Sequence, residues 1–477
     1  MNPISTLFAQ SGQQSTQPAL VHADFSMTYE QLTDTVKRIA TRLEQAGVRH
    51  GSIVGLRIRP EIEALFTLAV MQLGATSLHA SEVVVDGYSE HIDLLCTDDE
   101  FVRASGPSSL NVNLDFIQSL ASVRPRDEWV YFSEHDVCRI VFSSGSTGTP
   151  KGIPFTVAYL AERIHSAEQN WIPPTPFISL LGLDTVSGFL TFMWAMVRSE
   201  TFFISGDSAT NVGTILNHNI TAIKTSPAKL NDLLDHVEQR TQKLPSLHTV
   251  EVLGSLLTAR TIERCQKALN TTPLYLYGST EVGTVSKGAV KVDQPENVGT
   301  LVSDITAETL GDDGLPTRPR TIGRLRFRKK SMPVGYWNEG NPKPDQGFHE
   351  GWFYSGDIAT ITLDNELIIH GRSDDLVNAG GTKFTLQQLD SWLQNINLFA
   401  DAATAQFSDA NSDTKIAVAF VSKNSISQDA IMGQLNRFLP GLPIGAIIRL
   451  AEIERNPVGK VNRSAILSKL HQTERVT

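Results

Sequence analysis

The 477-residue sequence contains few cysteines and no long apolar run. Its three cysteines are odd in number and lack a Cys-x-x-Cys spacing, which argues against a disulfide framework and a metal site, so we expect buried thiols at Cys96, Cys138 and Cys265. No apolar run approaches the ~20 residues that a membrane helix needs. The first residues, MNPISTLFAQSGQQ, lack the charged and then apolar pattern of a signal peptide. These absences predict a cytoplasmic protein without a membrane span.

The sequence also lacks an excess of basic residues. Against 41 lysines and arginines stand 51 aspartates and glutamates, which gives a formal net charge of −10. This balance, without a prominent basic cluster, argues against a general nucleic-acid-binding protein. The hydrophobic content of 41% is that of a globular protein, and the length predicts two or more domains.

A loop rich in glycine and small hydroxyl residues, VFSSGSTGTPKGI, occupies residues 141–153 and follows a β-branched run typical of a strand. Glycines let the backbone approach a ligand closely, and exposed N–H groups, hydroxyls and a lysine all suit phosphate oxygens. Loops that follow a strand often bind phosphate in this way. We therefore predict a phosphate cradle made by Ser143, Ser144, Gly145, Ser146, Thr147, Gly148, Thr149 and Lys151.

Two other interpretations of this loop are a Walker-type phosphate loop and a flexible linker. A Walker loop would have glycine at Pro150 and serine or threonine at Gly152. A Ser/Gly linker fits the composition alone, but the embedded Thr-Pro-Lys-Gly argues against it. The string resembles instead the phosphate loop of the adenylate-forming superfamily, which includes acyl- and aryl-CoA synthetases, adenylation domains of peptide synthetases and beetle luciferases.

A second motif, YGSTE, ends a strand-like run of aromatic and aliphatic residues. A threonine hydroxyl can bond a phosphate oxygen, and a glutamate supplies the hard oxygen ligand that Mg²⁺ prefers. The motif resembles the one that the superfamily uses in this way. The resemblance implies that Tyr277 lies against the nucleotide together with Gly278 and Ser279, that Thr280 meets the α-phosphate, and that Glu281 holds the metal.

Three further segments match the superfamily's nucleotide site. A strand that runs into a glycine turn predicts close backbone approach to a flat ring, and the resemblance implies that Gly254, Ser255 and Leu256 stack on adenine. A carboxylate can accept hydrogen bonds from two vicinal hydroxyls, and the resemblance assigns that role toward ribose to Asp357, with Arg372 also at the ribose. Taken singly, the turn fits plain packing and the aspartate fits a hairpin.

A charged run without hydrophobic periodicity follows the strand at residues 367–371 and predicts a domain boundary. The resemblance implies an AMP-binding domain at residues 1–372 and a small C-terminal domain at residues 373–477, with Asp374 as the hinge. The AGGTK segment resembles the one that approaches the thioester-forming site, which implicates Gly380, Gly381 and Lys383.

The small domain shows one departure and one further match. The superfamily usually has proline and glutamate where this chain has Leu386 and Gln388, which puts the local packing and the tunnel for a thiol acceptor in question. By itself Lys460, in NPVGKVNR, is a solvated charge. By resemblance it is the catalytic lysine that enters the active site during adenylation.

The acid-binding pocket is predicted around residues 184–194. Asp184 precedes an apolar helical run, so it fits a helix N-cap, and it also fits the position where amino-acid-activating members pair with the substrate ammonium. The resemblance places Gly188 and Trp194 in the same pocket. Apolar residues here favour an uncharged acyl or aryl body, although they fit a buried helix equally: Leu180, Leu181, Leu183, Phe189, Phe192 and Trp194.

The expected fold is α/β: a large N-terminal domain of mixed sheets flanked by helices, with a small mobile α+β C-terminal domain. A helix at residues 29–45, capped by Thr28, and a strand at 53–58 followed by a helix at 61–73 begin a mostly parallel sheet. Residues 76–134 are less regular. In the C-terminal domain we expect helices at 387–393 and 427–438 and strands at 416–421 and 447–450.

These features predict an ATP-dependent, Mg²⁺-requiring acid:thiol ligase. It would activate a small carboxylic acid as acyl-AMP with release of pyrophosphate, and pass the acyl group to coenzyme A or to the phosphopantetheine of a carrier protein acting in trans. Open alternatives are an amino-acid-activating adenylation enzyme, a ligase with an amine acceptor, and an oxygenase of the luciferase kind. A non-catalytic nucleotide-binding regulator is the alternative from another class.

Overall fold

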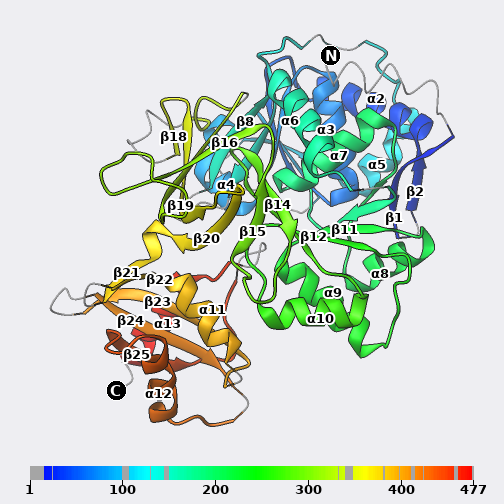
Figure 1. Ribbon diagram of the computed structural model, residues 1–477. Helices are drawn as coiled ribbons and strands as arrows, with labels where there is room; N and C mark the ends of the chain where they lie inside the picture. The colour runs from blue at the N-terminus through cyan, green and yellow to red at the C-terminus, as the bar shows by residue number, and fades with distance from the viewer. Residues whose placement is uncertain are drawn as a thin grey trace.

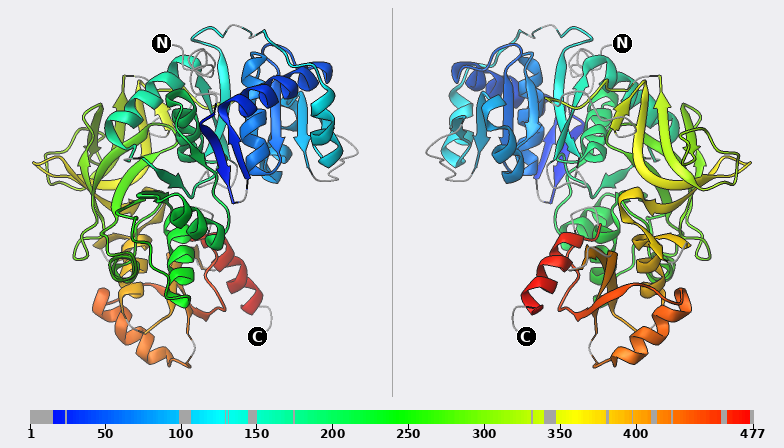
Figure 2. Two further views of the ribbon diagram at one scale, coloured as in Figure 1. Left: turned by 90° about the vertical axis from the view of Figure 1, so that its right-hand side faces the viewer. Right: turned by 90° about the vertical axis from the view of Figure 1, so that its left-hand side faces the viewer.

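The computed structural model describes residues 16–474, except 24, 99–106, 129, 131, 144–149, 174, 331, 339–346, 380–381, 397, 410–413, 423 and 456–459. Two large sheets with their helices form a large lobe up to residue 372, and residues 373–474 form a small lobe at one end of the molecule (Figures 1 and 2). This is the predicted α/β class with a small α+β part. The predicted boundary falls between β20 (Glu366–Arg372) and the short 3-10 helix η3 (Ser373–Asp375).

The first sheet has six strands in the order β6-β5-β3-β4-β7-β8. Its strands are parallel except for β8, which is antiparallel to β7. They are β3 (Ile53–Arg57), β4 (Thr76–His79), β5 (Leu94–Thr97), β6 (Ser108–Asn111), β7 (Val137–Ser143) and β8 (Lys151–Thr156). The expected irregularity of residues 76–134 is wrong, because this stretch holds three buried or edge strands that are too short to show a period.

The first helix on the first sheet, α2 (Tyr29–Gln45), confirms the predicted amphipathic pattern. It has the predicted bounds and the predicted cap, since Thr28 and Gln31 form a capping box. Its companions are α3 (Pro60–Gln72), α4 (Glu82–Tyr88), η1 (Ser89–His91), α5 (Leu114–Ser119) and η2 (Leu120–Ser122). A small sheet of β1 (Pro18–His22), β2 (Phe25–Thr28) and β10 (Phe202–Phe203) lies beside them.

The second sheet carries the YGSTE strand. Its main path is β16-β17-β19-β20-β15-β14-β13-β12-β11-β9, with β18 on β19. β9, β11, β12 and β13 are parallel, so their carboxyl ends meet at one edge, where ligands commonly bind. These four strands are β9 (Phe177–Ser179), β11 (Ala222–Thr225), β12 (Thr249–Val252) and β13 (Leu274–Ser279).

The remaining strands of this sheet pair in antiparallel fashion. They are β14 (Gly283–Ala289), β15 (Asn297–Leu301), β16 (Ile305–Leu310), β17 (Gly323–Lys329), β18 (Gly347–His349), β19 (Trp352–Ile361) and β20. The helices between the two sheets and beside the second are α6 (Val157–Asn170), α7 (Val186–Arg198), α8 (Ser208–Asn217), α9 (Pro227–Gln239) and α10 (Ala259–Leu269). Among the described residues, no helix is long and apolar enough to cross a membrane.

The small lobe has its own apolar cores on the two faces of the sheet β23-β24-β25. Its elements are β21 (Leu376–Ala379), β22 (Thr382–Thr385), α11 (Leu386–Asn395), β23 (Asp401–Ser408), β24 (Thr414–Val421), α12 (Gln428–Phe438), β25 (Ile444–Arg449) and α13 (Arg463–Glu474). The sequence missed β23 and α13. It placed α12 and β24 within two residues.

The two departures from the superfamily pattern leave the packing regular. Leu386 is the first residue of α11 and is only 1% exposed, so it fills the apolar core of the small lobe. Gln388 completes a capping box with Thr385, a role that glutamine and glutamate share. The doubt about local packing is thereby removed.

Candidate active site

The strands on either side of the glycine-rich loop, β7 and β8, are paired in antiparallel fashion. Ser143 at the end of β7 pairs with Lys151 at the start of β8, and Val141 pairs with Ile153. Residues 141–143 and 151–153, which we predicted to be part of the loop, therefore belong to strands β7 and β8. The predicted phosphate ligands Ser144, Gly145, Ser146, Thr147, Gly148 and Thr149 lie outside the described residues.

Tyr336 joins this hairpin to the YGSTE segment. The Lys151 ammonium lies 4.7 Å from the centre of the Tyr336 ring, and the Tyr336 hydroxyl donates to Oε1 of Glu281 at 3.1 Å. The next residue, Trp337, donates its backbone N–H to the carbonyl of Gly152 at 2.7 Å. Two predicted phosphate-binding elements thus meet through an aromatic residue that the sequence did not single out.

The YGSTE segment is held from behind by α6. Tyr159 donates to the carbonyl of Glu281 at 2.8 Å, and Arg163 donates to the carbonyl of Thr280 at 3.2 Å. A Cβ on Gly278 would lie 2.1 Å from the carbonyl oxygen of Gly283, so only glycine fits this bulge at the end of β13. The backbone of the predicted phosphate and metal ligands is therefore fixed by buried hydrogen bonds.

The predicted ribose ligands lie together. Tyr277 donates to Oδ2 of Asp357, and Arg372 lies 3.3 Å from Oδ1 of the same carboxylate. Asp357 and Arg372 face each other across β19 and β20, and Arg372 also donates to the carbonyl of Ser355. Burial and the Asp357 charge raise the pKa of Tyr277 well above its usual value, so its phenol remains a neutral donor.

The predicted adenine turn follows β12, beside the strand that carries Tyr277. Gly254 has a φ of +98°, which a residue with a side chain rarely adopts. Ser255 and Leu256 are half-buried. The Tyr275 hydroxyl accepts the backbone N–H of Leu257 at 2.7 Å and ties the turn to β13.

Lys460 brings the small lobe to this site. The charges of Asp357, Arg372 and Glu281 all act on its ammonium group, which places the lysine within electrostatic reach of the predicted ribose and metal ligands. Its side chain is exposed, and the protein atoms near it remove part of its hydration. This loss of hydration, aided by Arg372, lowers the pKa of Lys460, and the two carboxylates oppose the shift.

The predicted hinge lies between two arginines. Arg372 is bound to the large lobe through Asp357, whereas Arg463 of the small lobe pairs with Asp375 at 3.2 Å. Asp374 stands between them, exposed, in η3, with an oxygen 3.9 Å from Arg372.

The predicted thioester segment belongs to the hairpin β21–β22, where Lys383 pairs with Asn378. Gly380, Gly381 and the side chain of Lys383 lie outside the described residues.

The pocket predictions need correction. The N-cap of α7 is Thr185, whose hydroxyl accepts the N–H of Gly188 at 3.0 Å, so the interpretation of the exposed Asp184 as the cap is wrong. Gly188 is required sterically, because a Cβ there would lie 2.0 Å from the carbonyl oxygen of Gly182. Trp194 is 8% exposed and packs on Phe177 with ring centres 5.6 Å apart.

The apolar side chains of this region do not form one wall. Phe189 packs on Phe155 of β8, whereas Phe192 packs on Phe202 of β10. Leu180 belongs to the core on the other side of the second sheet. These residues therefore give no support to a single apolar acyl pocket.

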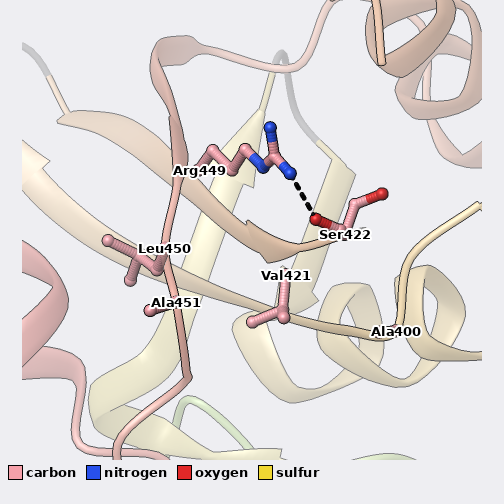
Figure 3. Close-up of a pocket in the computed structure, with 6 residues that line it drawn as sticks. All are labelled: Ala400, Val421, Ser422, Arg449, Leu450 and Ala451. Atoms are coloured by element: carbon pink, nitrogen blue, oxygen red, sulfur yellow. Dashed lines mark hydrogen bonds between the residues drawn. The ribbon is translucent and has the colours of Figure 1, made fainter. Parts of the chain in front are cut away.

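A shallow depression on the small lobe is separate from this site (Figure 3). It lies at the ends of β24 and β25, where Arg449 donates to the carbonyl of Ser422 at 2.6 Å. These strands carry none of the predicted site residues, so we assign the depression no role.

Comparison with known proteins identifies the chain's relatives. A family model described as "AMP-binding enzyme" matches residues 7–91 and 89–337. Among curated proteins, the zwittermicin A synthase ZmaJ of Bacillus cereus is 22% identical over 94% of this chain and 91% of its own length.

Two solved structures share the fold. The anthranilate CoA ligase AuaEII in complex with anthranoyl-AMP aligns with a TM-score of 0.85 and 19% identity, over 98% of this chain and 97% of its own. The O-succinylbenzoate coenzyme A synthetase MenE of Bacillus subtilis in complex with ATP and magnesium ion aligns with a TM-score of 0.83 and 18% identity, over 96% and 98%. At this identity the likeness establishes the fold.

Proposed function

Because the chain belongs to the AMP-binding enzyme family, we propose that this adenylate-forming ligase activates a carboxylic acid with ATP and transfers the acyl group to a thiol. The products of the first step are acyl-AMP and pyrophosphate. The thiol belongs to coenzyme A or to the phosphopantetheine of a separate carrier protein. The observation that carries the proposal is the hydrogen-bonded group of Tyr277, Asp357 and Arg372, in which Tyr277 belongs to the strand that leads into Thr280 and Glu281.

Lys460 assists the first step electrostatically. A carboxylate oxygen of the acid attacks the α-phosphorus of ATP, and the bond to the bridging oxygen of pyrophosphate breaks. The ammonium group neutralises negative charge on the attacking oxygen, the α-phosphate and the leaving oxygen in the transition state. No proton needs to move, so no general base is required.

Glu281 fits a role as magnesium ligand. Glu281 is 7% exposed, and the Tyr336 hydroxyl orients its carboxylate. A site with one carboxylate is common for Mg²⁺, which takes its other ligands from phosphates and water. Bound there, Mg²⁺ supplies charge neutralisation on the phosphates of ATP. Thr280 is held beside it to donate to the α-phosphate.

Tyr277, Asp357 and Arg372 bind the nucleoside. The neutral Tyr277 phenol and the Arg372 guanidinium orient the Asp357 carboxylate, which accepts hydrogen bonds from the two ribose hydroxyls. Gly254, Ser255 and Leu256 provide the flat surface for adenine. The hairpin ending at Lys151 binds the pyrophosphate that leaves.

The second step requires Lys460 to leave. We propose that the small lobe rotates about Asp374 after acyl-AMP forms, which withdraws the lysine and brings the segment of Gly380, Gly381 and Lys383 to the reaction centre. The thiolate attacks the acyl carbon, and AMP departs. One site then serves both reactions.

Acid-dependent exchange of labelled pyrophosphate into ATP tests the first step. Lys460→Ala should abolish exchange, a loss of about 10²–10³-fold or more, because the variant removes the positive charge that stabilises the transition state. The matched control is Lys469→Ala, since Lys469 lies on α13 and pairs with Glu454 at the surface. It should exchange at the wild-type rate.

The acceptor is tested separately. After exchange has identified an acid, coenzyme A, a pantetheinylated carrier and an amine are each supplied, and the product is identified by mass spectrometry. Thioester formation supports the proposal, whereas amide formation supports the amine ligase. Absence of exchange across a broad panel of acids would favour a nucleotide-binding regulator and contradict the proposal.

A further inference from the structure

A buried group of charges lies in the second sheet beside α7. Lys224 of β11 is fully buried, Glu251 of β12 is 1% exposed, and their charged atoms are 3.2 Å apart. Lys287 of β14 approaches the other carboxylate oxygen at 2.9 Å. Two ammonium groups therefore share one carboxylate, which leaves a net charge of +1 in the group.

This arrangement is costly for folding alone. The free energy needed to remove two charges from water is often larger than the free energy gained from their attraction. Apolar residues of similar volume would often make the folded state more stable. Burial outweighs the attraction of Glu251 and lowers the pKa of Lys224 to about 8. A fully buried ion pair whose carboxylate is shared with a third, partly exposed ammonium group therefore calls for a function.

The strand register places this group on the face of the sheet that α7 covers. Lys224 pairs with Ser179 of β9 on one side and with Glu251 on the other. Its ammonium donates to the carbonyl of Trp171 at 2.6 Å and lies 3.5 Å from the centre of the Trp171 ring. It is also 5.9 Å from the ring of Phe177 on β9. Lys224 thus points toward the layer of α6 and α7.

Helix α7, which covers this face of the sheet, carries two buried hydroxyls. Ser187, Thr191 and Trp194 share one face of α7, because they are four and three residues apart. Trp194 contacts Phe177, so this face turns toward β9 and β11. The buried Oγ of Ser187 and Oγ1 of Thr191 have no hydrogen-bond partner among the residues that the structure describes. Such groups need a ligand or water to satisfy them.

The sheet that carries Lys224 and Glu251 also leads to the proposed reaction centre. β11 and β12 are parallel to β13, whose carboxyl end leads into Thr280 and Glu281. Lys224 and Glu251 are each the last residue but one of their strands. An acid that lies along this edge with its reactive carboxylate at Thr280 would extend its other end toward the charged group.

We propose that Ser187, Thr191, Lys224, Glu251 and Lys287 form the distal end of the acid-binding site and select a carboxylic acid with a second carboxylate at its far end. The inference rests on the proposed function, because it names the class of acid that the same site activates. The second carboxylate complements the excess positive charge, and its oxygens accept hydrogen bonds from the two hydroxyls.

Matched pairs of acids test the proposal in the exchange assay. The probes are adipate against hexanoate and terephthalate against benzoate, which differ in the distal carboxylate. The wild type should show kcat/KM at least about tenfold higher for the dicarboxylate of one pair, because a hydrogen bond to a charged group is worth that factor.

Thr191→Val is the informative variant. It replaces a hydroxyl that has no hydrogen-bond partner among the described residues by a methyl group of similar size, so the melting temperature should not fall. The ratio of kcat/KM between dicarboxylate and monocarboxylate should drop severalfold. Thr214→Val on α8 is the matched control: it also removes a buried helical hydroxyl, one bound to the carbonyl of Thr210, and the ratio should stay at the wild-type value.

Lys224→Met should reverse the preference in favour of the monocarboxylate, and circular dichroism checks that this variant folds. If the wild type exchanges with monocarboxylates and does not favour their dicarboxylate partners, or Thr191→Val leaves the ratio unchanged, the inference is overturned while the proposed function stands. If neither member of any pair nor any other acid supports exchange, the proposed function falls and the inference falls with it.

Discussion

The nucleotide end of the site and the region around α7 use charge in different ways. At the nucleotide end, Asp357, Arg372 and Lys460 come from distant segments, and each retains contact with solvent. Around α7, Lys224 and Glu251 are sealed inside the sheet. The solvent-accessible charges of the first region can change their partners at a low cost in free energy. The buried charges of the second region keep their partners once the chain has folded. The first suits a reaction common to a family, and the second suits a choice of substrate by one chain.

Arg139 is a buried charge next to α7, and it predicts the largest effect on stability. It lies on β7 below the glycine-rich hairpin, is 1% exposed, and donates to Glu63 and to the carbonyl of Leu183, both at 2.9 Å. Glu63→Gln leaves the guanidinium buried without a counter-charge. We expect the free energy of unfolding to fall by about 3–5 kcal/mol, measured by urea denaturation.

Glu61→Gln is the control for this variant, since Glu61 is paired with Arg59 near the surface. It should cost less than about 1 kcal/mol. Similar losses for both variants would mean that buried and exposed pairs contribute alike, and the comparison between the two kinds of charge would fail.

Tyr277→Phe sharpens the comparison at the nucleotide end. The variant removes the hydroxyl that orients Asp357 and leaves the ring in place. Loss of a hydrogen bond to a charged group predicts about tenfold weaker binding of ATP, measured by calorimetry, with a small change in melting temperature. Tyr354→Phe, which removes a hydroxyl bound to Arg326 on the same sheet, should bind ATP as the wild type does. An unchanged affinity in Tyr277→Phe would argue against the ribose assignment.

The pH dependence of adenylation tests the solvent-facing charge of Lys460. Its folded pKa is lowered from 10.5, so the ammonium is present at neutral pH and is lost as the pH rises through the lowered value. The exchange rate should therefore decline on an alkaline limb below pH 10.5. In Lys460→Arg the residual activity should show no such limb, because a guanidinium stays protonated. An alkaline limb that persists in this variant would assign the titration to another group.

The sequence predicted elements whose signals are local. α2 was bounded correctly because its apolar residues follow the helical period and a capping box marks its start. Gly254 was placed in a turn, and its φ of +98° is one that glycine adopts readily. The resemblance to the superfamily's motifs predicted that Tyr277, Asp357 and Arg372 lie at one nucleotide site. In the structure, Tyr277 and Arg372 both contact the Asp357 carboxylate.

What the sequence missed depends on distant partners. Asp184 and Thr185 are both good capping residues, and only the path of the backbone into α7 decides between them. Tyr336 contacts Glu281 across 55 residues of sequence, and neither periodicity nor a motif indicates this contact. Lys224 and Glu251 are adjacent only through strand register, so neither could be recognised as buried from its own surroundings.

The two arginines beside Asp374 have a consequence for the path between the two reactions. Arg372 fixes the chain to the large lobe on one side, and Arg463 fixes Asp375 to the small lobe on the other. The torsion angles of Ser373 and Asp374 are therefore the soft coordinates that remain at the boundary, four angles in a stretch of two residues. If the small lobe rotates here as proposed, so short a segment would restrict the paths that Lys460 can follow out of the site. The return of the lobe along the same few angles would restore the lysine to the same position.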